Sequence, residues 1–395
     1  MKKISCLLLA VVILLSMVAC QDPSDGTTSS TDDSTQSVQG GTENKKPDQE
    51  VMYAVSISQS AEPTHAEDGK LIFTYTYQNM RLTLPDQAAA DKVIMDFFNR
   101  VDAFRTTANT TLEAAKKADH SSVNWIPYLC NTTYSPMRID SNVLSLTGSN
   151  ITYSGSAHPE RVSVSANYDL TTGDVLTLGS IMTPQAEAQN FCQLVLEVLE
   201  QSKSELHLYD GYDAAVKQRF NREVSDDQAW YFTQNGLCFY FEPYEIAPYS
   251  SGLIVAEIPY NKLSGLLNDR YFPAERIAVG GELQITNEKP ANTSGFTQIA
   301  EIVLDSNGQT IFLHTKGLLW DVAVAVGSWD SAGTAFTASY TALLSHTLSP
   351  GDAIMLQHIF DDPAVSVRAT YSNGKTDEVF YLKKNETDGS IILSK

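Results

Sequence analysis

The 395-residue sequence lacks the local motifs that most often mark a catalytic or metal site. It contains neither the G-x-S-x-G turn that presents a nucleophilic serine nor the H-E-x-x-H pair that binds zinc. The aspartate-containing turns at 305–308 and 388–389 have no closing glutamate of the kind that a calcium-binding EF-hand loop needs. We therefore assign no catalytic residue, no metal and no cofactor.

Positive charge is scarce as well. The chain has 27 Lys and Arg residues against 47 Asp and Glu residues, which gives a formal net charge of -20. Basic patches interleaved with aromatic residues are missing, so nucleic acid is not an expected partner. The excess of acidic groups is compatible with a basic protein partner at low salt.

Cysteines are few, and long apolar runs are confined to the start of the chain. Cys130, Cys192 and Cys238 allow at most one disulfide and match no metal spacing. We expect them to be buried free thiols. Beyond residue 20, no stretch approaches the ~20 apolar residues of a membrane-spanning helix.

The first 19 residues have the composition of a secretory signal, with two lysines followed by a short apolar run. The string L-S-M-V-A-C at 15–20 resembles the lipobox of bacterial lipoproteins. The resemblance implies that Cys20 carries lipid and holds the protein to the outer face of the bacterial cytoplasmic membrane. A plain signal peptide or a signal anchor is the alternative. Residues 20–50 are polar and are expected to form a disordered tether.

The remaining residues exceed the usual size of one hydrophobic core. We expect an α+β domain at 51–285, a polar linker at 286–295 and an all-β, sandwich-like domain at 296–395. The second domain is expected from several short strands at regular spacing, separated by turn residues.

One helix of the first domain has clear limits. Asp86 is its expected N-cap, and the helix should end near Ala118. Its apolar positions recur every three to four residues. These positions are Val93, Phe97, Val101, Phe104 and Leu112. The strands expected on either side, at 70–84 and 123–129, should pair antiparallel within an antiparallel sheet.

Residues 229–260 contain the strongest local pattern, two aromatic runs around Asn235-Gly236. That dipeptide favours a type I′ turn, which would place Phe232 opposite Phe239. Alternation of side chains then divides the hairpin into two faces. One face would carry Trp230, Phe232, Phe239 and Phe241, and the other Tyr231, Thr233, Cys238 and Tyr240.

Three strings connect this sequence to a known family. They are Y-S-G-S-A-H-P at 153–159, Y-D-L-T-T-G at 168–173 and P-Y-E-I-A-P-Y at 243–249. Over residues 52–272 the sequence resembles the extracellular domain of RsiV-type membrane anti-sigma factors, a domain also found ahead of the catalytic domain in a peptidoglycan deacetylase. The resemblance implies an antiparallel sheet with packed helices.

In RsiV-type factors this domain binds lysozyme, and binding exposes the anti-sigma factor to proteolysis. The resemblance therefore implies an extracellular binding or sensing protein of the bacterial cell envelope, which recognises lysozyme-like muramidases or peptidoglycan. We find no sigma-binding segment, spanning helix or deacetylase domain in the sequence, so we expect the sensory module alone.

The candidate binding residues are His158, Tyr244, Glu245 and Tyr249. His158 would act as a general base only with a positioned partner, for which Asp169, Glu245 or Tyr249 are available. The alternatives are that His158 satisfies backbone carbonyls in a turn and that the bend with Tyr244 and Tyr249 is a packed structural corner. Two other functions remain open: an envelope glycan hydrolase using His158 and Glu245, and a structural adaptor lipoprotein.

Overall fold

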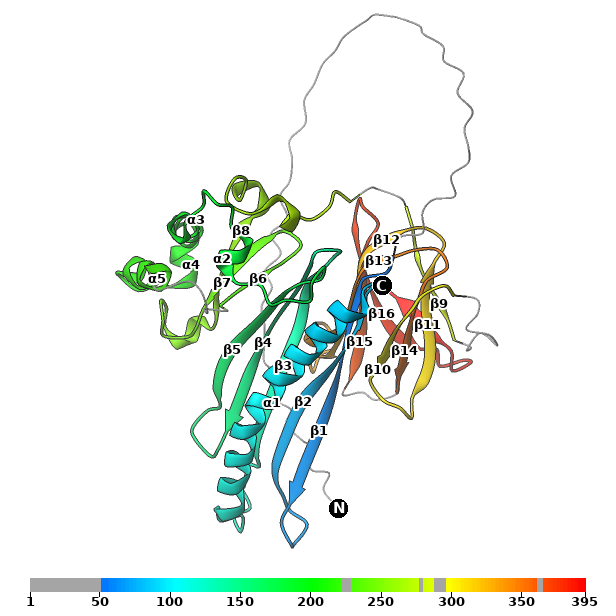
Figure 1. The fold of residues 1–395 in the computed structure, drawn as a ribbon. Coiled ribbons are helices and arrows are strands. Elements are labelled where there is room, and N and C mark those ends of the chain that lie inside the picture. Colours follow the sequence, from blue (N-terminus) through cyan, green and yellow to red (C-terminus); the bar gives the residue numbers. More distant parts are fainter. Residues whose placement is uncertain (1–50, 222–228, 277–279, 288–295, 361–364) are drawn as a thin grey trace, which may run out of the picture.

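The computed structural model describes residues 51–221, 229–276, 280–287, 296–360 and 365–395 (Figure 1). The expected signal sequence, the lipidation site Cys20 and the tether to residue 50 lie outside these residues. The same holds for most of the expected linker.

The largest element is a sheet of ten strands in the order β17-β16-β15-β12-β13-β1-β2-β3-β4-β5 (Figure 1). Its strands are β1 (Ala54–His65), β2 (Leu71–Thr83), β3 (Tyr128–Ile139), β4 (Val143–Tyr153), β5 (Glu160–Asp169), β12 (Leu319–Trp329), β13 (Phe336–Leu348), β15 (Ser366–Ser372), β16 (Asp377–Lys384) and β17 (Ile391–Ser394). Nearly all neighbouring strands pair antiparallel. Together with a small set of helices, this sheet confirms the predicted α+β class.

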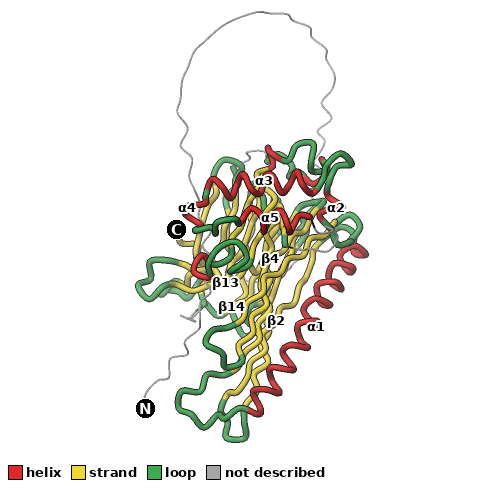
Figure 2. Tube along the Cα trace, turned by 90° about the vertical axis from the view of Figure 1, so that its left-hand side faces the viewer, coloured by secondary structure: helices red, strands yellow, loops and turns green. Residues whose placement is uncertain are grey.

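Helix α1 (Gln87–Lys117) lies along one face of the sheet, as Figure 2 shows. Asp86 begins it as predicted, because its carboxylate accepts hydrogen bonds from the backbone N–H groups of Ala88 and Ala89. Val93 and Phe97 are fully buried against the sheet. The helix ends with Ala118 as the C-cap, which also confirms the prediction.

The strands on either side of α1 pair in parallel, so the expected antiparallel pairing is wrong. Phe73 pairs with Tyr128 and Thr76 with Asn131, and α1 forms the crossover between β2 and β3. Helix α1 runs back from the end of β2 to the edge of the sheet at which β2 starts. Strand β3 therefore starts at that same edge and runs parallel to β2. The strand expected at 123–129 is also displaced, since Val123 is 98% exposed in a loop and β3 begins at Tyr128.

A second layer sits beside the β4–β5 end of the large sheet (Figure 1). It combines a three-stranded sheet with short helices around a core of its own. Its elements are α2 (Leu178–Ile181), α3 (Ala188–Gln201), α4 (Lys203–Leu206), α5 (Tyr212–Asn221), β6 (Trp230–Phe232), β7 (Gly236–Phe241) and β8 (Ile254–Pro259). The 3-10 turns η1 (Tyr249–Ser251), η2 (Tyr260–Lys262) and η3 (Asp269–Tyr271) complete it.

The aromatic hairpin β6–β7 forms, but its register differs from the prediction by two residues. Phe232 pairs with Leu237 and Trp230 with Phe239, so the turn centres on residues 234–235. A shift of two leaves each side chain on its predicted face. The two faces accordingly lie in separate clusters, one around Trp230 and one around Tyr231.

The C-terminal segment forms the expected sandwich-like packing. A four-stranded sheet, β10-β14-β11-β9, faces the β12–β16 half of the large sheet, and both sheets contribute to one core. Its strands are β9 (Leu283–Thr286), β10 (Ile299–Val303), β11 (Gln309–Thr315) and β14 (Ala353–His358). The predicted division at 286–295 remains a prediction, yet β1 pairs with β13, so strands from both sides of it share one sheet.

Arg138 joins the large sheet to the second layer. It is fully buried; its Nε donates a hydrogen bond to the Asp140 carboxylate at 2.7 Å, and its Nη2 lies 2.5 Å from the same carboxylate oxygen in an ion pair. It also donates to the Tyr260 hydroxyl at 2.5 Å and to the Tyr271 carbonyl at 2.6 Å. These bonds satisfy a charge that is otherwise costly to bury.

Candidate functional site

His158 lies in the loop between β4 and β5, residues 154–159. Gly155 has a φ of +88°, and a Cβ at this position would lie 2.8 Å from the Tyr128 hydroxyl, so the tight fit of the loop requires glycine. The Ser156 hydroxyl donates to the His158 carbonyl at 2.7 Å. The loop therefore has a defined shape and presents the His158 side chain on the surface.

The bend at residues 243–252 approaches this loop from the second layer. Ile246 and Ala247 anchor it, because both are buried in the core of that layer. The Tyr244 N–H donates to the Ala247 carbonyl at 3.0 Å, which holds Tyr244 at a φ of +72°. A positive φ is rare for a bulky residue and costs of order 1–3 kcal/mol. The backbone of Tyr244 is therefore strained, and its side chain is 65% exposed.

Three rings meet where the loop and the bend come together. The His158 and Tyr249 rings stack with centroids 5.4 Å apart and planes inclined by 28°. The Tyr249 and Tyr244 rings follow at 5.6 Å and 30°. Tyr249 is 49% exposed. We call these three residues the aromatic ridge; large rings with polar tips at the surface are typical of binding interfaces.

Two opposite charges lie next to the aromatic ridge. The Glu242 carboxylate accepts a hydrogen bond from the Ser163 N–H on β5 at 2.6 Å. Burial lowers the pKa of the Arg161 guanidinium, while Glu242 and Tyr249 oppose this shift. Within the described part of the chain, the buried Nε of Arg161 and the buried Oε2 of Glu242 have no hydrogen-bond partner. Such atoms are uncommon, and a water or a ligand group that bonded them would be stabilised.

Glu245 does not join the aromatic ridge. Its carboxylate lies 3.2 Å from the Arg219 guanidinium and accepts the Glu242 N–H at 2.9 Å. Arg219 in turn donates to the Tyr240 carbonyl at 2.6 Å. Glu245 therefore closes the bend from inside through Arg219 and the Glu242 N–H.

The acid–base pair considered for His158 is likewise not assembled. The Nδ1 atom of His158 lies 3.5 Å from the Pro159 carbonyl, and the described residues give it no carboxylate partner. Asp169 pairs with Arg270 at 2.9 Å, at the far end of β5. Of the candidate partners only Tyr249 reaches the His158 ring, through stacking.

The sequence motifs thus located three ridge residues and missed the charges beside them. Arg161 lies on β5 and Glu242 directly after β7, and neither belongs to one of the three family-like strings. The sequence shows only that Glu242 directly follows the apolar run of β7.

The three described cysteines are free and buried, which confirms the prediction. Burial raises the pKa of the thiols of Cys130, Cys192 and Cys238, so little reactive thiolate is present at neutral pH. No cluster of three or more His, Cys, Asp or Glu residues suited to a metal occurs in the described ranges. Nor do these ranges contain a helix that combines the length and the hydropathy needed to cross a membrane.

The fold and this site define an α+β chain whose second layer presents an exposed aromatic surface. Residues 181–261 of the chain match the model of the DUF3298 family, which is described as a protein of unknown function. The matched residues include α3, α5, the aromatic hairpin and the bend with Tyr244 and Tyr249.

Two solved structures are similar to this chain. A DUF3298 family protein from Pseudomonas aeruginosa PAO1 matches with a TM-score of 0.40 and 16% identity, covering 56% of this chain and 96% of that one. A DUF3298 family member from Bacteroides fragilis NCTC 9343 matches with a TM-score of 0.39 and 18% identity, covering 55% and 94%. A comparison with curated proteins gives no match.

Proposed function

We propose that the protein is a lipid-anchored, extracellular binding protein of the bacterial cell envelope, and that its aromatic ridge contacts a basic muramidase of the lysozyme class. One observation carries the proposal. The RsiV-type strings at 153–159 and 243–249 are distant in sequence, yet their aromatic residues His158 and Tyr249 stack on each other at the surface.

The form of the aromatic ridge suits the recognition of a protein. Tyrosine is enriched at interface hot spots, since its ring offers apolar area and its hydroxyl offers a hydrogen bond. The strained backbone of Tyr244 and the flanking Pro243 and Pro248 fix the bend before binding. A fixed surface loses little conformational entropy when a partner docks.

The charge of the chain favours a basic partner. The formal net charge is -20, and removal of the leader with Lys2 and Lys3 would bring it to -22. An acidic protein attracts a cationic one at a rate that falls as salt is added. The envelope location rests on the signal sequence and the lipobox-like string, and it would be tested by following Cys20→Ala protein from the membrane fraction to the medium.

The proposal predicts a loss of lysozyme binding when the aromatic ridge is truncated. Tyr249→Ala and Tyr244→Ala should each raise the Kd for hen lysozyme by about tenfold, because each removes a large exposed ring. Met95→Ala is a matched control, since Met95 on α1 is exposed to the same 65% as Tyr244. Binding is measured by biolayer interferometry at low and physiological salt.

Two results would reject the muramidase as the partner. One is the absence of lysozyme binding at both salt concentrations, and the other is wild-type binding by both tyrosine variants. If the same variants instead lost binding to purified peptidoglycan, the wall glycan would replace the muramidase as the partner of the aromatic ridge.

The hydrolase alternative is less well supported. Glu245, its expected second carboxylate, is held by Arg219 and by the Glu242 N–H. We expect His158→Ala to weaken lysozyme binding and to leave peptidoglycan turnover unchanged. A hydrolytic activity that disappeared in this variant would favour the enzyme instead.

A further inference from the structure

Two aliphatic side chains project into solvent from the loop between α1 and β3, residues 118–127. Val123 is 98% exposed and Ile126 is 60% exposed. We call this pair the apolar tip. Apolar side chains of this kind gain free energy when a partner removes them from water.

The loop that carries the apolar tip is held to the start of β2. The Lys70 ammonium donates to the Ser122 carbonyl at 2.8 Å and also to the His120 carbonyl. The Trp125 Nε1–H donates to the Leu71 carbonyl at 3.1 Å, and its backbone N–H donates to Ser122 at 3.2 Å. The tip is therefore fixed before any partner arrives, which lowers the entropic cost of binding.

Tyr128 connects this loop to the loop of the aromatic ridge. Loops 118–127 and 154–159 both lie at the end of the sheet where β3 begins and β4 ends. The Tyr128 ring stacks on Trp125 with centroids 5.2 Å apart and planes inclined by 25°. A Cβ on Gly155 would lie 2.8 Å from the Tyr128 hydroxyl. One side chain thus packs against both loops, and the apolar tip lies at the same end of the sheet as the ridge.

The aromatic ridge alone is too small for a stable protein interface. Specific interfaces bury about 800 Å² on each partner, contributed by about 20–30 residues a side. The ridge has three side chains. A protein docked on it has to cover neighbouring surface as well, and the apolar tip supplies exposed aliphatic area at the same end.

The surface around the two loops is acidic. Of the nearby cations, Lys70 is bonded to the loop, and Lys116 pairs with Glu113 at 2.7 Å. A basic partner would therefore meet exposed carboxylates beside the apolar tip. These carboxylates belong to Glu67, Asp68, Asp119 and Glu160.

We propose that the apolar tip is a second contact for the protein that binds the aromatic ridge, so that one basic muramidase covers both. This inference rests on the proposed function, from which it takes the partner. Val123 and Ile126 carry no charge and no polar side-chain atom. Their contribution is the removal of apolar area from water, and added salt should leave it unchanged.

The test is biolayer interferometry of the full chain with hen lysozyme at low and physiological salt. The double variant Val123→Ser/Ile126→Ser should raise the Kd by about tenfold at both salt concentrations, because it removes apolar area and no charge. Val123→Ser alone should produce part of this change. Both variants should keep the wild-type melting temperature, since the replaced side chains are exposed.

The other edge of the ten-stranded sheet offers a matched control. Val379 on β16 and Ile392 on β17 are the same two residue types, and each is 42% exposed. The double variant Val379→Ser/Ile392→Ser should bind lysozyme as wild type does.

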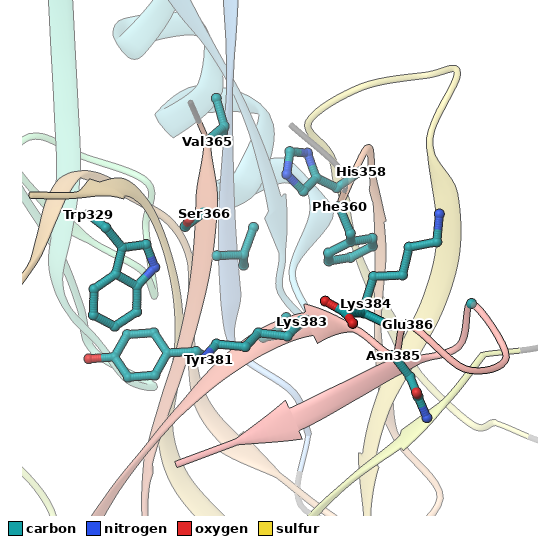
Figure 3. A pocket seen from close by; sticks show the side chains of 13 residues that line it. Trp329, His358, Phe360, Val365, Ser366, Tyr381, Lys383, Lys384, Asn385 and Glu386 are labelled. Carbon is teal, nitrogen blue, oxygen red and sulfur yellow. The ribbon is translucent and has the colours of Figure 1, made fainter. Parts of the chain in front are cut away.

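A groove of about 620 Å³ also lies at that edge, lined in part by Trp329 and Tyr381 (Figure 3). Two other lining residues, Phe360 and Val365, adjoin residues 361–364, which lie outside the described ranges. We therefore place no site in this groove. The control residues Val379 and Ile392 do not line it.

The possible results separate this inference from the proposed function. Wild-type binding by both tip variants, with a loss in Tyr249→Ala, would overturn the inference and leave the ridge as the binding site. No lysozyme binding by the wild-type chain would reject both. If the double variant does not fold, Val123→Ser decides.

Two further results would assign the apolar tip to another partner and overturn the inference. One is unchanged lysozyme binding by the double variant together with weaker co-sedimentation with phosphatidylglycerol vesicles, which would favour a lipid surface. The other is unchanged lysozyme binding with a smaller assembly on size-exclusion chromatography, which would favour a second copy of the chain.

Discussion

Arg138 lies at the point where β3 meets the segment that follows β8, and it bonds to side chains or backbone on both sides. Arg138→Met would leave the Asp140 carboxylate buried without its cation. We expect a loss of about 3–5 kcal/mol in the free energy of unfolding, measured by urea denaturation. The double variant Arg138→Met/Asp140→Asn should lose less free energy of unfolding than the single variant, because it leaves no buried carboxylate without a cation. A loss below about 1 kcal/mol in the single variant would contradict this role.

His314 on β11 gives the protein a pH-dependent contribution to stability. Burial, and to a smaller extent Lys316, lowers the pKa of His314 below its ordinary value of 6.5. The unfolded chain therefore binds this proton at a higher pH than the folded chain does. The contribution is complete above pH 6.5 and is lost as the pH falls through and below that value.

Replacing His314 should remove this effect. We expect the melting temperature of His314→Gln to fall less than that of wild type between pH 7.5 and pH 5, as measured by circular dichroism. His158→Gln, on an exposed loop, is the control and should follow wild type. A wild-type slope in His314→Gln would show that another group causes the dependence.

At the scale of single residues, the sequence identified those that carry a motif. His158, Tyr244 and Tyr249 were found because each belongs to a family-like string. Arg161 and Glu242 were not, because their relation arises only when β5 and the end of β7 come together in the fold.

Among the elements, α1 was predictable from end to end because its signals are local. Asp86 caps the helix with its own side chain, and the apolar positions recur within one helix face. The parallel pairing of β2 and β3 was missed because it depends on which strand the chain meets after the helix. Side-chain alternation within each strand carries no information about that neighbour.

The observed hairpin register predicts different costs for alanine substitutions at Asn235 and at Gly236. Gly236 has no positive φ, but a Cβ there would lie 2.2 Å from the Ile258 carbonyl oxygen of β8. We expect Gly236→Ala to destabilise the protein by about 1–3 kcal/mol through this clash. Asn235→Ala should cost no more than about 0.5 kcal/mol, since the turn does not use its side chain. If urea denaturation gave the same loss in the free energy of unfolding for both variants, the result would favour the type I′ turn predicted at Asn235-Gly236.

For the whole molecule, the sequence indicated the α+β class and the sandwich-like C-terminal part, but not the sheet that joins them. Ala54 of β1 pairs with Ser345 of β13, and the Met52 N–H donates to the Gln298 side chain at 3.0 Å. Both contacts span most of the chain. The alternation of apolar and polar residues shows that there are strands on both sides of the polar linker. It does not show whether these strands form one shared sheet or two separate sheets.

The shared sheet predicts that the two halves depend on each other. The fragment 51–285 lacks β13, so one edge of β1 loses its partner and the apolar face beneath it is uncovered. We expect this fragment to melt at a lower temperature than 51–395 in circular dichroism and to associate on size-exclusion chromatography. A monomeric fragment with the melting temperature of the longer chain would contradict the prediction.

The position of β1 also sets an order in time. β1 is the first described strand to leave the ribosome, and it lies in the interior of the sheet between β2 and β13. Its pairing with β2 can form at once, whereas β13 is synthesised only after most of the chain. Pairing between segments so distant in sequence is slow to form, and an open strand edge can recruit wrong partners meanwhile. The nascent chain therefore has to remain protected until its last third has been made.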